Sequence, residues 1–318
     1  MDEIFDDEDA FAEAAGRHRR ELHVHCYRML GNFEEAEDLV QETLLRAWRG
    51  RAGFDRAAPS ANLRAWLYRI ATNACLDVLR GSSRRLTSYG SFAEVPWLQP
   101  YPDRLLGEIS PDEPDAAVVA RETVELAYIA VIQLLPPRQR AVLLLRDVLG
   151  WPAAQVADQL GMTVASANSA LQRARATLKE NAPRRDEASA AWEPTEVERR
   201  LLNGFIDSHQ SGDFAAAVAL MHEDIRITMP PLPLCYDGRG AITPLLERAR
   251  AMGEWRLLPS GANRRPAALS YLRRPGDTEF RASKIDVIRV ADGLIREVTT
   301  FDARFFAAFG MPEVLAGS

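Results

Sequence analysis

The chain has 318 residues, a formal net charge of -6, 47% hydrophobic residues and 26% charged residues. This length exceeds one typical domain, and the ordinary hydrophobic content allows each of two or three domains to bury a core. The acidic balance excludes a protein that coats nucleic acid over its whole surface, so any contact with DNA must be local.

Neither a secretory signal nor a membrane span is predicted. The first residues lack a basic start followed by an apolar run, and no later apolar run approaches the roughly 18 residues of a spanning helix. Cys26, Cys75 and Cys235 are too few and too far apart for a disulfide framework or a zinc site built on paired cysteines. We therefore expect a cytoplasmic protein without a metal or a cofactor.

Two amphipathic helices are predicted in the first 80 residues. In FEEAEDLVQETLLRAW, residues 33–48, apolar side chains recur at helical spacing and form one stripe. A polar face that also carries a leucine fits a protein-binding surface, and a solvated helix face is the alternative, which explains the charges but not the leucine. The side chains on that face are Asp38, Gln41, Glu42 and Leu45. The second helix covers residues 62–80, and the polar side chains on it or just before it include Asn62, Arg64, Arg69 and Asn73.

From residue 81 to residue 117 the periodicity disappears, and Ser, Pro and charged residues dominate. This composition predicts a linker. The motif WLQPYPD places Trp97 and Tyr101 among prolines that favour extended structure. We expect these two aromatic side chains to dock on another surface.

A helix-turn-helix is predicted within residues 118–181. Gly161 follows a short helix, and Thr163 can cap the next one. This arrangement lays the second helix across the major groove, although one more helix pair in a bundle is the alternative. Its polar side chains can bond base edges and phosphates. These side chains are Ser166, Asn168, Ser169, Gln172, Arg173 and Arg175.

Residues 195–313 change in kind, because two helices are followed by runs with the period-two pattern of strands. These runs are IRITM, ALSYLRR, EFRASKIDVIRV and LIREVTTF. An α+β domain is predicted here. Asp237 and Arg239 lie in a Gly-rich turn, where a structural role and a contact role are both open. His209 and His222 lie near helix ends rather than on strands, so no catalytic residue is assigned.

The motifs LPPRQRAVLLLRDVLGW, VADQLG and RARATL resemble region four of the extracytoplasmic function (ECF) sigma factors of the sigma-70 family, and residues 18–80 resemble region two. The last domain resembles the SnoaL-like domains of the cone-shaped α+β fold. The resemblance implies a multidomain protein with four parts. They are an all-α sigma region 2 at 11–80, a linker at 81–117, a helix-turn-helix sigma region 4 at 118–181, and a SnoaL-like α+β domain at 195–313.

The resemblance also implies a function, which is a bacterial sigma factor without enzymatic activity. Such a protein binds core RNA polymerase, directs it to promoters and assists melting of promoter DNA. The face with Asp38 and Leu45 would bind core polymerase, while the polar residues of the second helix and the loop GRAGFDRAAPSAN before it would contact the minus-ten element. The helix-turn-helix residues would read the minus-thirty-five element.

One departure from the family is expected to weaken the minus-thirty-five contact. Relatives commonly carry basic residues where this chain has Asn168 and Ala170. The loss of two positive charges from the DNA face would reduce both affinity and its dependence on salt.

The fused domain is expected to modulate the sigma regions in place of a separate anti-sigma factor, since a tethered domain has a high effective concentration. Trp97, Tyr101, Asp237 and Arg239 are the candidate regulatory interface. A small-molecule ligand of this domain stays open. The main alternative is a one-component helix-turn-helix regulator with a ligand-sensing domain, which would bind DNA as a dimer without polymerase. A SnoaL-type enzyme that also binds DNA is a further option.

Overall fold

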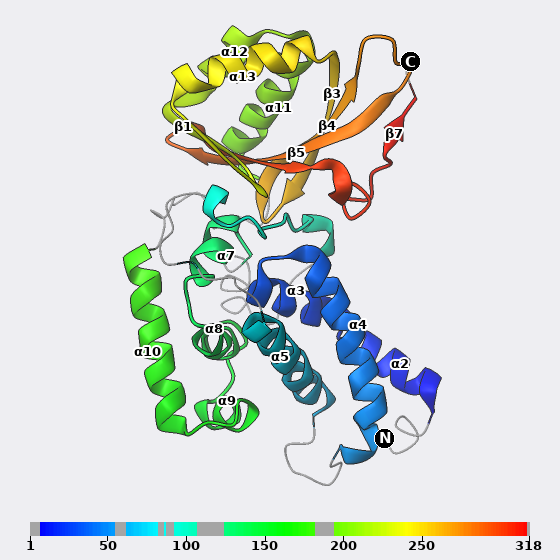
Figure 1. The fold of residues 1–318 in the computed structure, drawn as a ribbon, viewed down its shortest axis with the longest axis vertical. Coiled ribbons are helices and arrows are strands. Elements are labelled where there is room, and N and C mark those ends of the chain that lie inside the picture. The colour runs from blue at the N-terminus through cyan, green and yellow to red at the C-terminus, as the bar shows by residue number, and fades with distance from the viewer. Residues whose placement is uncertain are drawn as a thin grey trace. The chain divides into compact units, whose positions relative to one another are not determined.

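A computed structural model gives the fold, which divides into two compact units (Figure 1). The residues that the structure describes are 7–54, 62–81, 86, 92–106, 124–181 and 194–316. The first unit contains the described residues up to 86 together with 124–181, and the second contains 92–106 and 194–316.

The first half of the first unit is helical. Its helices are α2 (Glu8–Gly16), α3 (Arg19–Leu30), α4 (Phe33–Gly50) and α5 (Leu63–Gly81), with a short 3-10 turn η1 (Arg51–Gly53) after α4. The side chain of Asn32 accepts a hydrogen bond from the Glu35 amide at 2.9 Å and thereby caps α4. Ala36, Val40 and Ala47 are fully buried, as the predicted apolar stripe requires. Both predicted helices are confirmed.

The second half of the first unit contains the helix-turn-helix. Its elements are α7 (Leu126–Ile132), α8 (Pro137–Leu143), a π-helical turn η4 (Leu144–Val148), α9 (Ala153–Gln159) and α10 (Val164–Asn181). Gly161 adopts the left-handed conformation with φ 59°, which ends α9. Thr163 Oγ1 accepts a hydrogen bond from the Ser166 amide at 3.1 Å and caps α10, as predicted. The two halves pack together through α8, which contacts both α3 and α5.

The second unit is an α+β domain in which helices cover one face of a strongly curved mixed sheet (Figure 1). The helices are α11 (Glu196–Ser211), α12 (Phe214–Ala219) and α13 (Arg239–Ala251). The strands are β1 (Met221–Met229), β2 (Leu232–Asp237), β3 (Glu254–Ala262), β4 (Arg265–Arg273), β5 (Phe280–Ala291), β6 (Leu294–Asp302) and β7 (Val314–Leu315). The strand order is β2-β1-β6-β5-β4-β3, β7 pairs with β5, and β1 runs parallel to β6.

The core of this domain lies between the helices and the concave side of the sheet. Phe205 of α11 and Ile242 of α13 pack there against Ile225 and Ile288 of the sheet. The predicted strands β1, β4, β5 and β6 are confirmed, and each contributes side chains to this core. The burial of β4 does not alternate, because residues 266–272 are all buried. β2 and β3 were not predicted, since Pro233 and Pro259 interrupt their patterns, and both strands lie at sheet edges where proline is tolerated.

Part of the predicted linker belongs to this domain. Residues 92–106 contain two 3-10 turns, η2 (Phe92–Glu94) and η3 (Asp103–Leu105). Tyr101 is 1% exposed, its amide donates to Asn263 Oδ1 at 2.7 Å, and its carbonyl accepts from the Asn263 amide at 2.8 Å. The Arg264 amide donates to Asp103 Oδ1 at 2.8 Å. The segment is therefore fastened to the turn between β3 and β4.

The conformation of the turn between β3 and β4 allows this contact. Asn263 and Arg264 form a two-residue connection, and both have positive φ, 54° and 61°, as a tight hairpin of this kind requires. Asn263 is fully buried, so its amide side chain can reach the linker backbone without competition from water.

Gly261→Ala should loosen the docked segment, because a Cβ at this position would lie 2.7 Å from Asp103 Oδ2. We expect hydrogen exchange at the Tyr101 amide to accelerate by about tenfold, which corresponds to about 1.4 kcal/mol of local stability. Gly240→Ala is the matched control, since a Cβ at Gly240 meets nothing within 4 Å. Equal protection in the two variants would contradict the proposed fit of Asp103 against Gly261.

Candidate functional site

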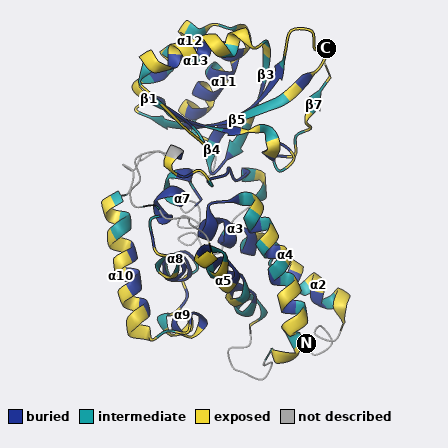
Figure 2. Ribbon diagram, in the orientation of Figure 1, coloured by how far each residue is buried: buried dark blue, intermediate teal, exposed yellow. Residues whose placement is uncertain are grey.

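The predicted protein-binding face of α4 is present as one surface. Asp38, Gln41 and Leu45 are exposed, and Leu45 is 49% exposed although it is a large apolar side chain (Figure 2). Glu42 lies between them and forms an ion pair with Arg46, with Nε to Oε1 at 2.7 Å. The spacing of three, four and seven residues places all four predicted residues on one side of the helix. This side can offer an apolar anchor inside a polar rim.

The predicted residues of α5 divide into two kinds. Arg69 and Asn73 are exposed and lie four residues apart on one face. Arg64 instead pairs with Glu21 of α3, with Nη2 to Oε2 at 2.7 Å. The side chain of Asn62 accepts from the Arg64 amide at 2.9 Å at the start of the helix. Residues 55–61 of the predicted base-capturing loop lie outside the described residues.

The Arg64 ion pair is partly shielded from water. Burial would raise the pKa of Glu21, but the Arg64 and His18 partners outweigh burial and hold that pKa below its usual value. Tyr68 also donates to Glu21 Oε2 at 3.1 Å. Arg64 therefore joins α5 to α3, whereas Arg69 and Asn73 face outward.

On α10, the outward side carries the predicted polar residues (Figure 2). Ser166, Asn168, Ser169, Gln172 and Arg173 are all exposed. Arg175 forms a two-pronged ion pair with Asp147 of the π-helical turn, with Nε to Oδ2 at 2.9 Å and Nη2 to Oδ1 at 2.6 Å. Part of the charge of Arg175 is thus already matched within the domain.

The expected loss of two charges from the DNA face needs a correction. Ala170 is 3% exposed and belongs to the buried stripe with Ala167, Leu171 and Ala174. A side chain at position 170 points into the domain in this fold, so only Asn168 lies on the exposed side.

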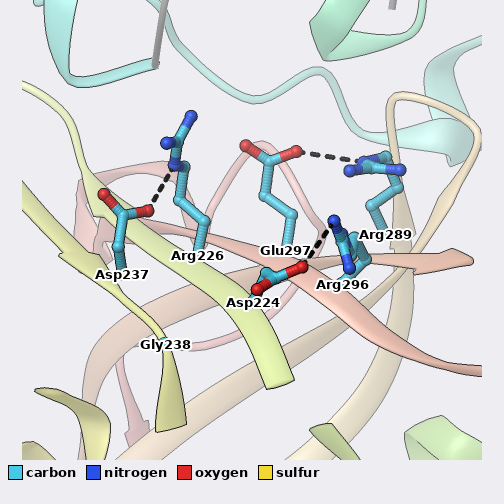
Figure 3. A pocket seen from close by; sticks show the side chains of 7 residues that line it. All are labelled: Asp224, Arg226, Asp237, Gly238, Arg289, Arg296 and Glu297. Atoms are coloured by element: carbon cyan, nitrogen blue, oxygen red, sulfur yellow. Dashed lines mark hydrogen bonds and ion pairs between the residues drawn. The ribbon is translucent and has the colours of Figure 1, made fainter. Parts of the chain in front are cut away.

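A charged cavity of about 540 Å³ lies on the face of the sheet opposite the three helices (Figure 3). Its lining residues are Asp224, Arg226, Asp237, Gly238, Arg289, Arg296 and Glu297. They form the ion pairs Arg226 to Asp237 at 2.6 Å, Arg289 to Glu297 at 3.0 Å, and Arg296 to Asp224 at 3.2 Å. Three cations face three carboxylates, so the described lining is neutral. It favours a partner that brings both signs of charge.

The Gly-rich turn contributes to this cavity unequally. Asp237 lines it, and hydrogen bonding to Arg226 holds the pKa of this carboxyl below its usual value. Gly238 has φ 78°, so the turn needs a residue without a side chain. Arg239 turns away and donates from Nε to the Met221 carbonyl at 2.9 Å, which ties α13 to β1. Arg239 has a structural contact here, and Asp237 is the turn residue that is available for recognition.

His209 lies in the last turn of α11, as the sequence predicted. Its Nδ1 bonds the Phe205 carbonyl at 2.7 Å, and burial, helped by Lys284 and opposed by Asp286, lowers its pKa to about 4. Asp286 is fully buried, accepts from Thr300 Oγ1 at 2.7 Å and pairs with Lys284 at 2.8 Å. The prediction that His209 lies near a helix end is confirmed, although α11 packs directly on β3 and β4. The same prediction is wrong for His222, which lies in strand β1 because α12 already ends at Ala219.

Comparison with known families matches all three parts of the chain. The model for sigma-70 region 2 matches residues 15–85, the model for sigma-70 region 4 matches residues 125–178, and the model for the SnoaL-like domain matches residues 202–298.

The chain is also similar to individual sigma factors. The ECF RNA polymerase sigma factor SigG of Mycobacterium tuberculosis is 40% identical over 316 residues, which cover 94% of this chain and 83% of SigG. SigW of Bacillus subtilis is 29% identical over 173 residues, which cover 54% of this chain and 89% of SigW. The crystal structure of the M. tuberculosis ECF sigma factor SigJ matches with a TM-score of 0.60 at 24% identity, over 96% of this chain and 100% of SigJ, and it supports the fold.

Sigma regions 2 and 4 in this order define a promoter-recognition subunit of RNA polymerase. The chain belongs to the ECF RNA polymerase sigma factors, with a SnoaL-like domain after region 4. As such it binds core RNA polymerase and promoter DNA and directs transcription initiation. The alternative of a one-component regulator leaves region 2 without a role. Within the part of the chain that the structure describes, no helix is long and apolar enough to cross a membrane.

Leu45→Ser should weaken binding to core polymerase by about tenfold, because it removes the apolar anchor of the α4 face. The measurement is a titration of core polymerase with labelled full-length protein. Val197→Ser is the matched control, since Val197 is another exposed aliphatic side chain, at 37%, on α11. Equal affinities of the two variants would show that the α4 face does not bind polymerase.

Proposed function

We propose that the C-terminal domain modulates this sigma factor by holding the linker, and so restrains how far regions 2 and 4 can separate. The observation that supports this proposal is the pair of hydrogen bonds between Asn263 and the backbone of Tyr101. These bonds join residues 162 positions apart in the chain. The linker that connects the two DNA-binding regions is thereby bound to a third domain.

The length of chain between the two regions determines how much docking shortens the maximum distance between them. The segment between α5 and α7 comprises residues 82–125. Fully extended, it could reach about 150 Å. When residues 92–106 are docked, residues 82–91 reach at most about 35 Å and residues 107–125 about 65 Å. Docking therefore removes roughly a third of the available reach.

The distance between the two promoter elements is close to the reach that remains when the linker is docked. The minus-ten and minus-thirty-five elements lie about 25 base pairs apart by their names, which is about 85 Å along the duplex. The two free arms together reach at most about 100 Å, so a docked linker has less slack at this distance than a free one and loses more conformational entropy there. Release of the linker removes that cost, so docking opposes promoter binding and release favours it.

The surfaces receive the following assignments within this proposal. The α4 face with Leu45 binds core polymerase, Arg69 and Asn73 contact the minus-ten element, and the outward side of α10 with Arg173 contacts the minus-thirty-five element. Arg64 and Arg175 support these surfaces through their carboxylate partners. Asn62 shapes the start of α5.

The C-terminal domain acts in this proposal as a regulatory module rather than an enzyme. The cavity lined by Asp237 carries charges that sum to zero, and it is where a small zwitterionic ligand or a protein segment would bind. Such binding would shift the domain between holding and releasing the linker. That no separate anti-sigma factor is required stays a prediction, and purified protein that is repressed without one would support it.

Asn263→Gly should raise transcription at limiting core polymerase by about threefold, because it removes the side chain that holds Tyr101. Glycine tolerates the positive φ of position 263, so the turn itself is retained. The measurement is in vitro transcription with purified core polymerase on a promoter library.

Asp292→Gly is the matched control, since Asp292 also has positive φ, 53°, in the hairpin turn between β5 and β6. We expect it to behave as the wild type. If Asn263→Gly releases the linker, as hydrogen exchange would show, and output does not rise, the restraint is wrong.

A further inference from the structure

A buried arginine connects region 4 to region 2. Arg140 of α8 is 3% exposed, and its guanidinium donates to the Met29 carbonyl of α3. It also donates to the Gln133 side-chain oxygen at 2.6 Å, the Gln133 carbonyl at 3.0 Å and the Leu135 carbonyl at 3.2 Å. The side chain is thus anchored in region 4, and its tip contacts the backbone of region 2.

The end of α3 is a suitable receptor for this charge. Met29 is the penultimate residue of α3, so its carbonyl is among the last four that lack a partner within the helix. These carbonyls carry the negative end of the helix dipole. A guanidinium loses its hydration when it is buried, and it is stable there only if acceptors replace the water. Met29 supplies one of those acceptors from the other region.

Two more contacts fit the regions together. Gly31 ends α3 in the left-handed conformation, and a Cβ at Gly31 would lie 3.4 Å from the Gln133 side-chain amide. The rings of Tyr68 on α5 and Trp151 before α9 meet edge to face with centroids 5.4 Å apart. Tyr68 is 1% exposed and Trp151 is 6% exposed, so this contact excludes water.

The closed arrangement is too short for a promoter. Helix α8 packs against both α5 and α10, the two helices that carry the candidate DNA contacts. Packed helices lie 8–10 Å apart, so the axes of α5 and α10 are within about 20 Å where they flank α8. These helices have 19 and 18 residues, which gives each a length of about 28 Å. Both the separation of the two helix axes and the helix lengths are much smaller than the roughly 85 Å between the two promoter elements.

We propose that Arg140 is a latch that holds regions 2 and 4 closed, and that this latch opens before the protein engages both promoter elements. The exposed faces of α4, α5 and α10 remain accessible in the closed state, so the latch acts on their separation and not by covering them. Opening returns the guanidinium to water, which offsets the lost hydrogen bonds. Only the open fraction can bind both elements, so the apparent affinity for the promoter falls in proportion to that fraction. The latch acts within the first unit and does not rest on the docked linker.

Energy transfer within the full-length protein tests the latch directly. Asp77 of α5 and Lys179 of α10 are exposed and lie outside the candidate DNA contacts, so each can be replaced by a labelled cysteine. Cys26 and Cys75 are buried, and Cys235→Ser removes the exposed thiol. We expect high transfer in the free protein and a large decrease in the complex with core polymerase and promoter. High transfer that persists in a complex competent for transcription would overturn the proposal.

Arg140→Ala supplies the second test. We expect lower transfer in the free protein and about fivefold less sigma factor for half-maximal transcription at fixed polymerase. Arg138→Ala is the matched control, because Arg138 lies on the same helix and is exposed, and it should change neither quantity. A folded Arg140→Ala protein with unchanged transfer would refute the latch. If circular dichroism shows that Arg140→Ala does not fold, the wild-type transfer measurement decides the question alone.

Discussion

The hydrogen bonds between Asn263 and the backbone of Tyr101 determine how this chain is organised. They require a turn in which two consecutive non-glycine residues hold positive φ, and they place an amide side chain in a fully buried position. Such an amide is stable only when its donors and acceptors are satisfied, and the linker backbone satisfies its oxygen. The connection between regions 2 and 4 thereby becomes part of the SnoaL-like domain.

The docked linker and the Arg140 latch both act on the separation of regions 2 and 4. The first limits the reach of the connecting chain, and the second stabilises direct contact between the regions. Both leave the candidate surfaces for polymerase and DNA exposed, with Leu45, Arg69 and Arg173 open to solvent. In this proposal, regulation limits the distance between the two regions and does not cover their DNA-binding helices.

Much of the fold follows from local patterns in the sequence. The apolar stripe of α4, the Thr163 cap and the alternation of β5 and β6 each depend on residues within a few positions of one another. The edge strands β2 and β3 escaped prediction because their prolines break the pattern. The family resemblance placed Ala170 on the DNA face, whereas its own spacing with Ala167, Leu171 and Ala174 would have placed it in the buried stripe.

The contacts that control the arrangement were not predictable, because their partners are distant in the chain. Tyr101 was expected to dock, but nothing near it identifies Asn263 as the receptor. The sequence predicts part of the role of Arg140, because a charged residue beside the apolar run from Ala141 to Leu145 needs buried partners. It does not identify the partner, because a backbone carbonyl of α3 has no sequence signature. Non-local acceptors of this kind need a structure.

The most direct test of the linker restraint is hydrogen exchange at the Tyr101 amide, measured in the free protein and in the complex with core polymerase and promoter. The account predicts strong protection in the free protein, where this amide donates to Asn263, and loss of that protection when both promoter elements are engaged. A transcriptionally competent complex in which the Tyr101 amide stays fully protected would contradict it.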